Sequence, residues 1–353
     1  MTTRNARDHG ITTGTLETGP TNSLADVPGV SFGQVTLSNG PVQTGVTVIH
    51  PTEDSAFERK CIAACHVING FGKSVGLMQL SELGQLETPI VLTNTLSVGT
   101  ASTALVRHML AGHPAIGDTT GTVNPVVMEC NDGAYLNDIR GLHVTEDHVL
   151  KALQQHVATL EQGARGAGTG MSCYGLKGGI GSASRRVPLA DRTFTLGAAT
   201  LCNMGRLPNL IVGGRPVGAE IVALENSKAG AVAELGSIII ILGTNAPLTA
   251  RQMERICKRA TAGLARTGTQ FGSGSGDVVL GFTTANRQPH SAPSNPVMAV
   301  EMLHEESLDG LFSATIEVVE EAILNALFAA ETTHGKQGRS RKSLSDWWKE
   351  LEA

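Results

Sequence analysis

Aromatic side chains are scarce in this sequence of 353 residues, at 3% of the chain. A core with so few rings has to be built mainly from Val, Ile, Leu and Ala, within an apolar fraction of 41%. The 42 glycines allow close approaches between backbones. This composition favours closely packed layers of sheet and helix over a loose collection of small modules.

The sequence also lacks the marks of several functional classes. A net charge of −5 argues against a nucleic-acid partner, and no apolar run is long enough for a membrane partner. The six cysteines contain no C-x-x-C pair and the eleven histidines form no H-E-x-x-H motif, so we expect no metal and no other cofactor. The polar N-terminus has no apolar signal segment. We therefore expect a cytoplasmic protein with reduced thiols.

Strand and helix patterns follow one another in mixed blocks. Strands are expected at residues 63–69, 89–94, 126–130, 193–203, 237–242 and 278–284, and helices at 97–110, 146–161, 249–264 and 311–331. Residues 219–234 are expected to form an exposed connection, and residues 336–353 a polar C-terminal tail. Strands that are apolar on both faces, such as 237–242 (SIIIIL), need cover on both sides. The pattern predicts an α+β fold with packed sheets between helical layers.

The most informative local sequence is GSGSGD at residues 272–277, directly before an expected strand. One interpretation is a tight turn, which three glycines permit. A phosphate-binding loop is disfavoured because no Gly-Lys-Ser or Gly-Lys-Thr follows and the next element is a strand. A third interpretation is a self-cleaving site, in which a serine hydroxyl attacks the preceding glycine carbonyl and water opens the resulting ester. The freed α-amine, with an ordinary pKa near 7.7–8.0, can then take the proton of its own residue's hydroxyl.

The third interpretation is supported by a resemblance that covers most of residues 17–335. It is carried by TGPTN (18–22), DVPGV (26–30), VINGFGK (67–73), ELGQLETPI (82–90), LTNTLSVG (92–99), GTGM (168–171), KGGIG (177–181), GSGD (274–277) and EEAILN (320–325). With these motifs in this order, the chain resembles the DmpA family of N-terminal-nucleophile aminopeptidases. This is peptidase family S58, which includes L-aminopeptidase D-esterases and β-peptidyl aminopeptidases.

The resemblance implies a four-layer α-β-β-α sandwich, of the DmpA and ornithine-acetyltransferase type, in one domain over residues 1–335. It implies cleavage between Gly274 and Ser275 into chains 1–274 and 275–353, with Ser275 as the nucleophile. Ser273 is the competitor, but only Ser275 precedes Gly-Asp. Substrates would be small peptides, amino-acid amides or esters, without a metal, and the assembly a homotetramer of processed heterodimers.

The resemblance also points to groups that stabilise the charge on the substrate carbonyl. Tyr174, in the glycine-rich segment, matches a family tyrosine. An asparagine is expected beside it, and Asn245 after the strand 237–242 is our candidate, with Asn203 as the alternative. The family often has an acidic residue after the tyrosine, where this chain has Gly175.

Carboxylates are expected in two further roles. On a helical wheel of residues 311–331, Glu320 lies at the edge of the apolar face and Glu321 points nearly opposite, so Glu320 is the predicted catalytic carboxylate. A hydroxyl residue that some family members have nearby is replaced by Val319. Recognition of a substrate ammonium needs an acidic residue, for which Glu129 is the candidate and Asp132 lies nearby.

Two other functions fit the same sequence. An acyltransferase resembling ornithine acetyltransferase would pass the acyl group to an amine, although that relative typically uses a threonine nucleophile. A non-enzymatic protein that binds a small molecule would remain a single uncut chain.

Overall fold

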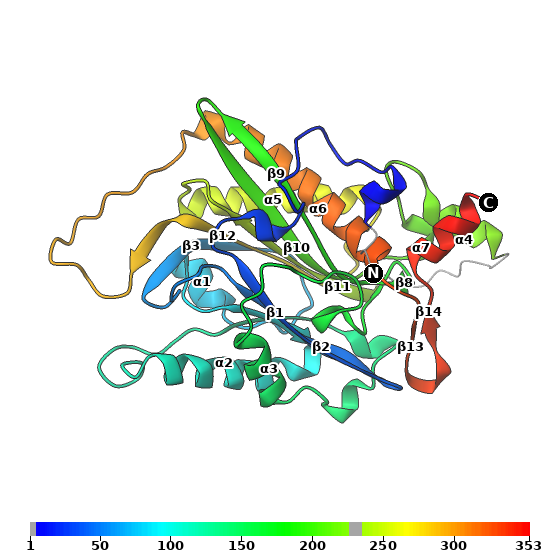
Figure 1. Ribbon diagram of the computed structural model, residues 1–353, viewed down its shortest axis with the longest axis horizontal. Helices are drawn as coiled ribbons and strands as arrows, with labels where there is room; N and C mark the ends of the chain where they lie inside the picture. Colours follow the sequence, from blue (N-terminus) through cyan, green and yellow to red (C-terminus); the bar gives the residue numbers. More distant parts are fainter. Residues whose placement is uncertain (1–4, 226–234) are drawn as a thin grey trace.

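The computed structural model describes residues 5–225 and 235–353. Two β-sheets are stacked face to face, and helices cover the outer face of each (Figure 1). In the view of Figure 1 the layers run from α5 and α6 at the top to α2 and α3 at the bottom. The predicted α-β-β-α sandwich is thereby confirmed.

The larger sheet has six strands. Their order is β4 (Gln85–Leu86), β3 (Arg59–Gly70), β12 (Gly274–Pro289), β11 (Leu235–Thr244), β10 (Arg192–Asn203) and β9 (Gly179–Leu189). Only β11 and β12 are parallel, and the helix between them, α5 (Ala250–Arg266), provides the crossover. Consequently β3 and β10 run opposite to β12 and end beside its start.

The smaller sheet has four strands. Their order is β1 (Ser31–Asn39), β2 (Val42–His50), β5 (Ile90–Asn94) and β6 (Val126–Cys130). Here β5 and β6 are the parallel pair, joined through α2 (Val98–Gly112). With α3 (Glu146–Leu153), α2 packs on the outer face of this sheet. The smaller elements are α1 (Leu77–Leu83), β7 (Ser172–Cys173), β8 (Leu176–Lys177), α4 (Val217–Leu224), β13 (Thr333–His334), β14 (Ser340–Arg341) and α7 (Leu344–Leu351).

Alternation along β11 explains why this strand is apolar throughout. Ile238, Ile240 and Leu242 pack in the core beneath α5 and α6 (Asp309–Ala329), whereas Ile239 and Ile241 pack in the core between the sheets. Successive side chains of a strand point to opposite faces, and both faces of β11 are covered. The same parity identifies the face on which each residue at the start of β12 lies.

Three segments differ from the sequence-based expectations. The helix predicted for 146–161 ends at Leu153, because the chain then pairs Val157 with Phe32 of β1 through two 2.9 Å backbone hydrogen bonds. The predicted connection at 219–234 begins inside α4, and its residues 226–234 lie outside the described residues. The predicted polar tail contains α7, in which Leu344 is fully buried and Trp347 is 9% exposed. In the described ranges, no helix combines the length and apolar character that a membrane crossing requires.

Candidate active site

The Gly274–Ser275 bond lies at the start of β12, inside the larger sheet. Ser275 is beside Gly236 of the parallel strand β11, and Gly276 is beside Gly70, the last residue of β3. The strand begins four residues before the predicted start at 278, so Ser275 is held by strand pairing and is only 1% exposed. A side chain at Gly276 would lie 3.0 Å from the Phe71 carbonyl oxygen, which explains the need for glycine there.

The backbone before Ser275 forms a tight turn. The Ser275 N–H donates to the Gly272 carbonyl at 2.8 Å, and Phe271, just before the turn, has a left-handed φ of 53°. A positive φ is unfavourable for a bulky residue and marks local strain. The Asn69 side-chain amide donates to the carbonyls of Gly272 (3.2 Å), Ser273 (3.3 Å) and Ser275. Asn69, at the end of β3, thus fixes the backbone on both sides of Gly274.

The Ser275 hydroxyl donates to Asp277 Oδ1 at 2.6 Å. Residues two apart on a strand share a face, and both lie opposite Ile238 and Gly236 on the face beneath the helical layer. Asp277 is 2% exposed, so this contact is shielded from water. Sequence reasoning did not assign Asp277 a function, although its spacing from Ser275 in the GSGD motif carried the signal.

Glu129 is buried near Ser275, and no cationic partner lies beside it in the described part of the chain. Its Oε1 accepts the Lys73 N–H at 2.7 Å and its Oε2 accepts the Thr95 hydroxyl, while its exposure is 2%. None of the ion pairs formed within residues 5–225 and 235–353 includes Glu129. A side chain at Gly72 would contact both Glu129 Oε1, at 3.6 Å, and Gly276 Cα, at 3.8 Å. The carboxylate therefore faces the start of β12 across Gly72.

Tyr174 lies at the tip of a two-residue hairpin between β7 and β8. Tyr174 and Gly175 both have left-handed φ values, of 52° and 73°, as a type I′ turn requires. The fully buried phenol shares a 2.8 Å hydrogen bond with the Thr267 hydroxyl, at the end of α5. The segment that begins at Thr267 leads into the GSGSGD turn, so Tyr174 contacts the start of the segment that precedes Ser275.

The two candidate asparagines lie at opposite ends of the larger sheet. Asn245 follows β11, about 30 Å from Gly236, the partner of Ser275, at roughly 3.3 Å per residue. Its side-chain oxygen accepts the Thr195 N–H at 2.8 Å. The expected position of Asn245 beside the nucleophile is therefore wrong, because β11 runs parallel to β12 and carries Asn245 away from Ser275.

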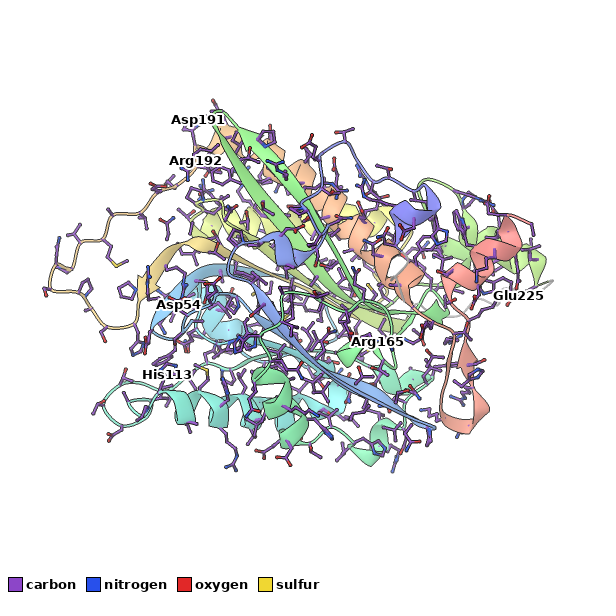
Figure 2. The ribbon with its side chains drawn as sticks, in the orientation of Figure 1. Asp54, His113, Arg165, Asp191, Arg192 and Glu225 are labelled. Carbon is purple, nitrogen blue, oxygen red and sulfur yellow. The ribbon has the colours of Figure 1, made fainter. Side chains whose placement is uncertain are left out.

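Asn203 lies at the correct end of the sheet. It pairs with Ser237, which in turn pairs with Gly276. Asp191 and Arg192 mark the β9–β10 turn in Figure 2. Since β10 runs from Arg192 to Asn203, Asn203 is at the opposite end of this strand from the turn. Its amide donates to the Asn131 carbonyl at 3.0 Å and accepts the Ser172 N–H at 2.9 Å. These contacts join the ends of β6 and β10 next to the start of β12.

Of the two glutamates of α6, Glu320 lies at the edge of the buried face as the helical wheel predicted, but Glu321 does not lie on the exposed side. Glu321 is fully buried, because residues near the N-terminus cover that side of α6, and Arg7 and Arg185 each lie 2.6 Å from it. Burial acts to raise the pKa of Glu321, but the two guanidinium groups outweigh it and the net pKa is lowered. Glu320 is 9% exposed and pairs with Arg266 at 3.1 Å. Its polar contact is thus a surface-edge ion pair, not Ser275.

Asp132 has a different environment from Glu129. Its Oδ1 accepts a 2.9 Å hydrogen bond from Asn137, and burial raises the pKa of its carboxyl to about 7. Nearby Lys177 is fully buried, and burial lowers the pKa of its amine to about 7. The Lys177 amine donates to the carbonyls of Gly168, Met171 and Gly178. The positive charge of Lys177 acts to lower the pKa of Asp132, but burial outweighs it.

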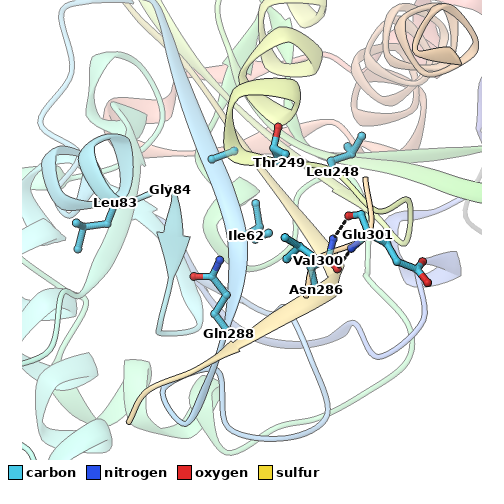
Figure 3. A pocket seen from close by; sticks show the side chains of 10 residues that line it. Ile62, Leu83, Gly84, Leu248, Thr249, Asn286, Gln288, Val300 and Glu301 are labelled. Carbon is cyan, nitrogen blue, oxygen red and sulfur yellow. Dashed lines mark hydrogen bonds between the residues drawn. The ribbon is translucent and has the colours of Figure 1, made fainter. Parts of the chain in front are cut away.

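Two further features lie outside this constellation. Among the residues that the structure describes, no group of three or more His, Cys, Asp and Glu side chains is arranged to hold a metal ion. A cavity of about 170 Å³ lies between Leu83, Leu248 and Val300 (Figure 3). Asn286 and Gln288, near the far end of β12 from Ser275, also line it, so this cavity is separate from the candidate active site.

Comparisons with known proteins identify the family of this chain. The model of peptidase family S58 matches residues 22–341. The β-peptidyl aminopeptidase BapA of Sphingosinicella microcystinivorans is 37% identical over 348 residues, covering 92% of this chain and 86% of the relative. The PH0078 protein from Pyrococcus horikoshii OT3 has a crystal structure with TM-score 0.93 and 46% identity, covering 99% and 98% of the two chains.

A third relative combines the fold with a described activity. The L-aminopeptidase D-Ala-esterase/amidase from Ochrobactrum anthropi, a serine aminopeptidase with a variant Ntn-hydrolase fold, matches with TM-score 0.88 and 36% identity over 99% of both chains. Sequence identity at this level across nearly the whole chain shows membership of the same family and not only a shared fold. The chain described here therefore belongs to peptidase family S58, and it is a hydrolase, an aminopeptidase of the Ntn-hydrolase fold.

Proposed function

We propose that this aminopeptidase cuts its own chain between Gly274 and Ser275 and then uses Ser275 to release N-terminal residues through an acyl-enzyme. The new α-amine of Ser275 is the base that takes the proton from its own hydroxyl. This proposal is supported by the tight turn before Ser275, the strained φ of Phe271 and the clamp of Asn69 on the surrounding carbonyls. Strained backbone of this kind is concentrated at functional sites.

The observation that carries the exopeptidase function is the buried carboxylate of Glu129. A buried charge is costly unless it is paired, and within residues 5–225 and 235–353 the partners of Glu129 are a backbone N–H and a hydroxyl. A substrate ammonium above Gly72 would supply the missing cation. Because Gly72 adjoins both Glu129 and Gly276, an amine held there lies close to the nucleophile. This arrangement favours substrates with a free N-terminus over internal peptide bonds.

We assign to Tyr174 and Asn203 the role of stabilising the negative charge that develops on the substrate carbonyl oxygen. The Asn203 amide donates at the nucleophile end of the sheet, and the Tyr174 hydroxyl is held there by its hydrogen bond with Thr267, from which it would turn to the substrate carbonyl oxygen. Ser275 attacks the carbonyl, the amine component leaves, and water then releases the acyl group. Glu320 retains a positioning role through its pair with Arg266 at the end of α5.

The relatives indicate a substrate class, and an exposed apolar segment indicates a contact between copies of the chain. BapA is named a β-peptidyl aminopeptidase, so peptides and amides with an N-terminal β-amino acid are the first substrates to test. Val297, Met298, Val300 and Met302 are exposed on an irregular segment that extends from the body in Figure 1, which supports a homo-oligomer of processed chains. All six cysteines are free thiols, consistent with a cytoplasmic location.

Intact-mass measurement tests the proposal. Purified protein is expected to contain one fragment ending at Gly274 and one beginning at Ser275. Ser275→Ala should remain uncut and inactive, whereas the matched control Ser273→Ala should still be cut. An uncut chain in an active preparation would refute the mechanism. Cleavage of Ser275→Ala would show that Ser275 is not the serine that attacks. Acyl transfer to an added amine, in preference to water, would instead indicate the acyltransferase alternative.

A further inference from the structure

Self-cleavage requires a base that the mature enzyme does not need. Before the chain is cut, the Ser275 nitrogen is part of the Gly274–Ser275 peptide bond, so it has no basic lone pair. Its N–H donates to the Gly272 carbonyl at 2.8 Å. The α-amine of the mature site therefore cannot activate the Ser275 hydroxyl for the first reaction, and another group must accept that proton.

We infer that Asp277 is the base for self-cleavage. Its Oδ1 accepts the hydrogen bond of the Ser275 hydroxyl at 2.6 Å, which is the reach needed for direct proton transfer. Both residues are almost fully buried, at 1% and 2% exposure, so water does not compete for the contact. This inference rests on the proposed cleavage between Gly274 and Ser275, and it assigns that reaction a base of its own.

Other carboxylates near this end of the sheet have different contacts. The oxygens of Glu129 accept hydrogen bonds from Lys73 and Thr95, on the other side of Gly72. Glu320 is paired with Arg266 at 3.1 Å. In the described part of the chain, Asp277 is the carboxylate that contacts the Ser275 hydroxyl.

The reaction balances with this one carboxylate. Asp277 takes the proton from the Ser275 hydroxyl as the oxygen bonds to the Gly274 carbonyl carbon. The carbon–nitrogen bond then breaks, and the protonated Asp277 returns the proton to the departing Ser275 nitrogen. One water molecule hydrolyses the ester, which leaves a Gly274 carboxylate, a free Ser275 hydroxyl and the Ser275 amine.

Asn69 is the positioning residue for this step. Its amide contacts the carbonyls of residues 272, 273 and 275, and the Phe71 N–H donates to the Ser275 carbonyl at 3.2 Å. The carbonyl under attack, that of Gly274, lies between these fixed groups. Holding its neighbours on both sides keeps the peptide bond in the turn while the hydroxyl approaches, which is how orientation lowers a barrier.

The test follows cleavage of freshly made chain. Wild type, Asp277→Asn and Ser273→Ala are synthesised in a cell-free system, and conversion of the 36.8 kDa chain is followed over time. Because a general base contributes a factor of about 100 or more, cleavage of Asp277→Asn should be slowed at least about 100-fold, whereas Ser273→Ala should be cut at the normal rate. Thermal unfolding compared with uncut Ser275→Ala checks that Asp277→Asn is folded.

A second variant separates chemistry from packing. Asp277→Ala leaves space at the missing carboxyl, and sodium formate is expected to restore measurable cleavage by acting as the base. Cleavage of Asp277→Asn within threefold of wild type would overturn the inference. So would a folded Asp277→Ala chain that remains uncut with formate. Failure of the wild type to cut at Gly274–Ser275 would refute the proposed function itself, which is a distinguishable result.

Discussion

Replacing Glu129 with glutamine tests how the enzyme recognises a free N-terminus. Glutamine has the same size, and its carbonyl oxygen can still accept the 2.7 Å hydrogen bond from the Lys73 N–H. The substitution therefore removes the negative charge and keeps the packing of a residue that is 2% exposed. The expected loss falls on substrate binding and not on folding.

The size of the effect follows from the burial of the carboxylate. A charge-assisted contact in a desolvated site loses about 3 kcal/mol when one charge is removed, because the partner's charge is left unpaired. At 1.4 kcal/mol for each factor of ten, kcat/KM for an aminoacyl amide should fall about 150-fold. Self-cleavage should continue, because the uncut bond presents no ammonium to Glu129.

The assay compares alanine p-nitroanilide with the propionyl analogue, which lacks the amine. Glu129→Gln should lose activity on the first compound only, so that the preference for a free amine disappears. Glu82→Gln, which removes the same charge from an exposed position, is the matched control. If Glu129→Gln hydrolysed the aminoacyl compound within threefold of wild type, the assignment of the ammonium site to Glu129 would be wrong.

Two further predictions concern the space above Gly72 and the buried ion pairs of α6. In Gly72→Ala the new methyl group would lie 3.6 Å from Glu129 Oε1, which is an ordinary contact, so the chain should still fold and cut itself. The methyl group would occupy the space of the substrate ammonium, so KM should rise roughly tenfold, which corresponds to about 1.4 kcal/mol. An unchanged KM would refute this placement of the ammonium. Arg185→Met leaves Glu317 and Glu321 without the guanidinium that lies 2.7 and 2.6 Å away, and urea unfolding at pH 7 should show a loss of about 3–5 kcal/mol. The pKa of Glu321 in the folded chain lies below its unfolded value of 4.5, so the stabilisation by its ion pairs is present above pH 4.5 and is lost as the pH falls through the folded pKa. The loss of unfolding free energy caused by Arg185→Met should therefore become smaller below pH 4.5. A loss that stays constant with pH would contradict the reasoning.

The sequence predicts the layers well because apolar strands report their own burial. The run at 237–242 needed cover on both faces, and the structure places helices beneath one face and a second sheet beneath the other. The helix predicted for 146–161 is longer than the observed one because its second half is placed by a distant part of the chain. Its second half pairs with Phe32, more than a hundred residues earlier, and a local pattern contains no information about that partner.

The direction of strands explains the choice between Asn245 and Asn203. Both asparagines follow apolar strands, so local sequence treats them alike. Their separation depends on β11 being parallel to β12 while β10 is antiparallel, a property of pairing that emerges only in the assembled sheet. The same limit applies to Glu321. The helical wheel assumes one covered face, whereas residues such as Arg7 cover a second face of α6.

The position of the proposed scissile bond also explains how a cut chain could remain folded. Ser275 starts a strand with neighbours on both sides, since β12 pairs with β11 over ten residues and with β3 along its other edge. The proposed cleavage would remove one covalent bond at the end of that strand and none of these pairings. The fragment beginning at Ser275 would also retain α6, which packs on β9 and β10 of the other fragment. The proposed new terminus would therefore be released only locally, next to Asp277, where a small rearrangement would bring the amine to its own hydroxyl while the sheet holds the site in place.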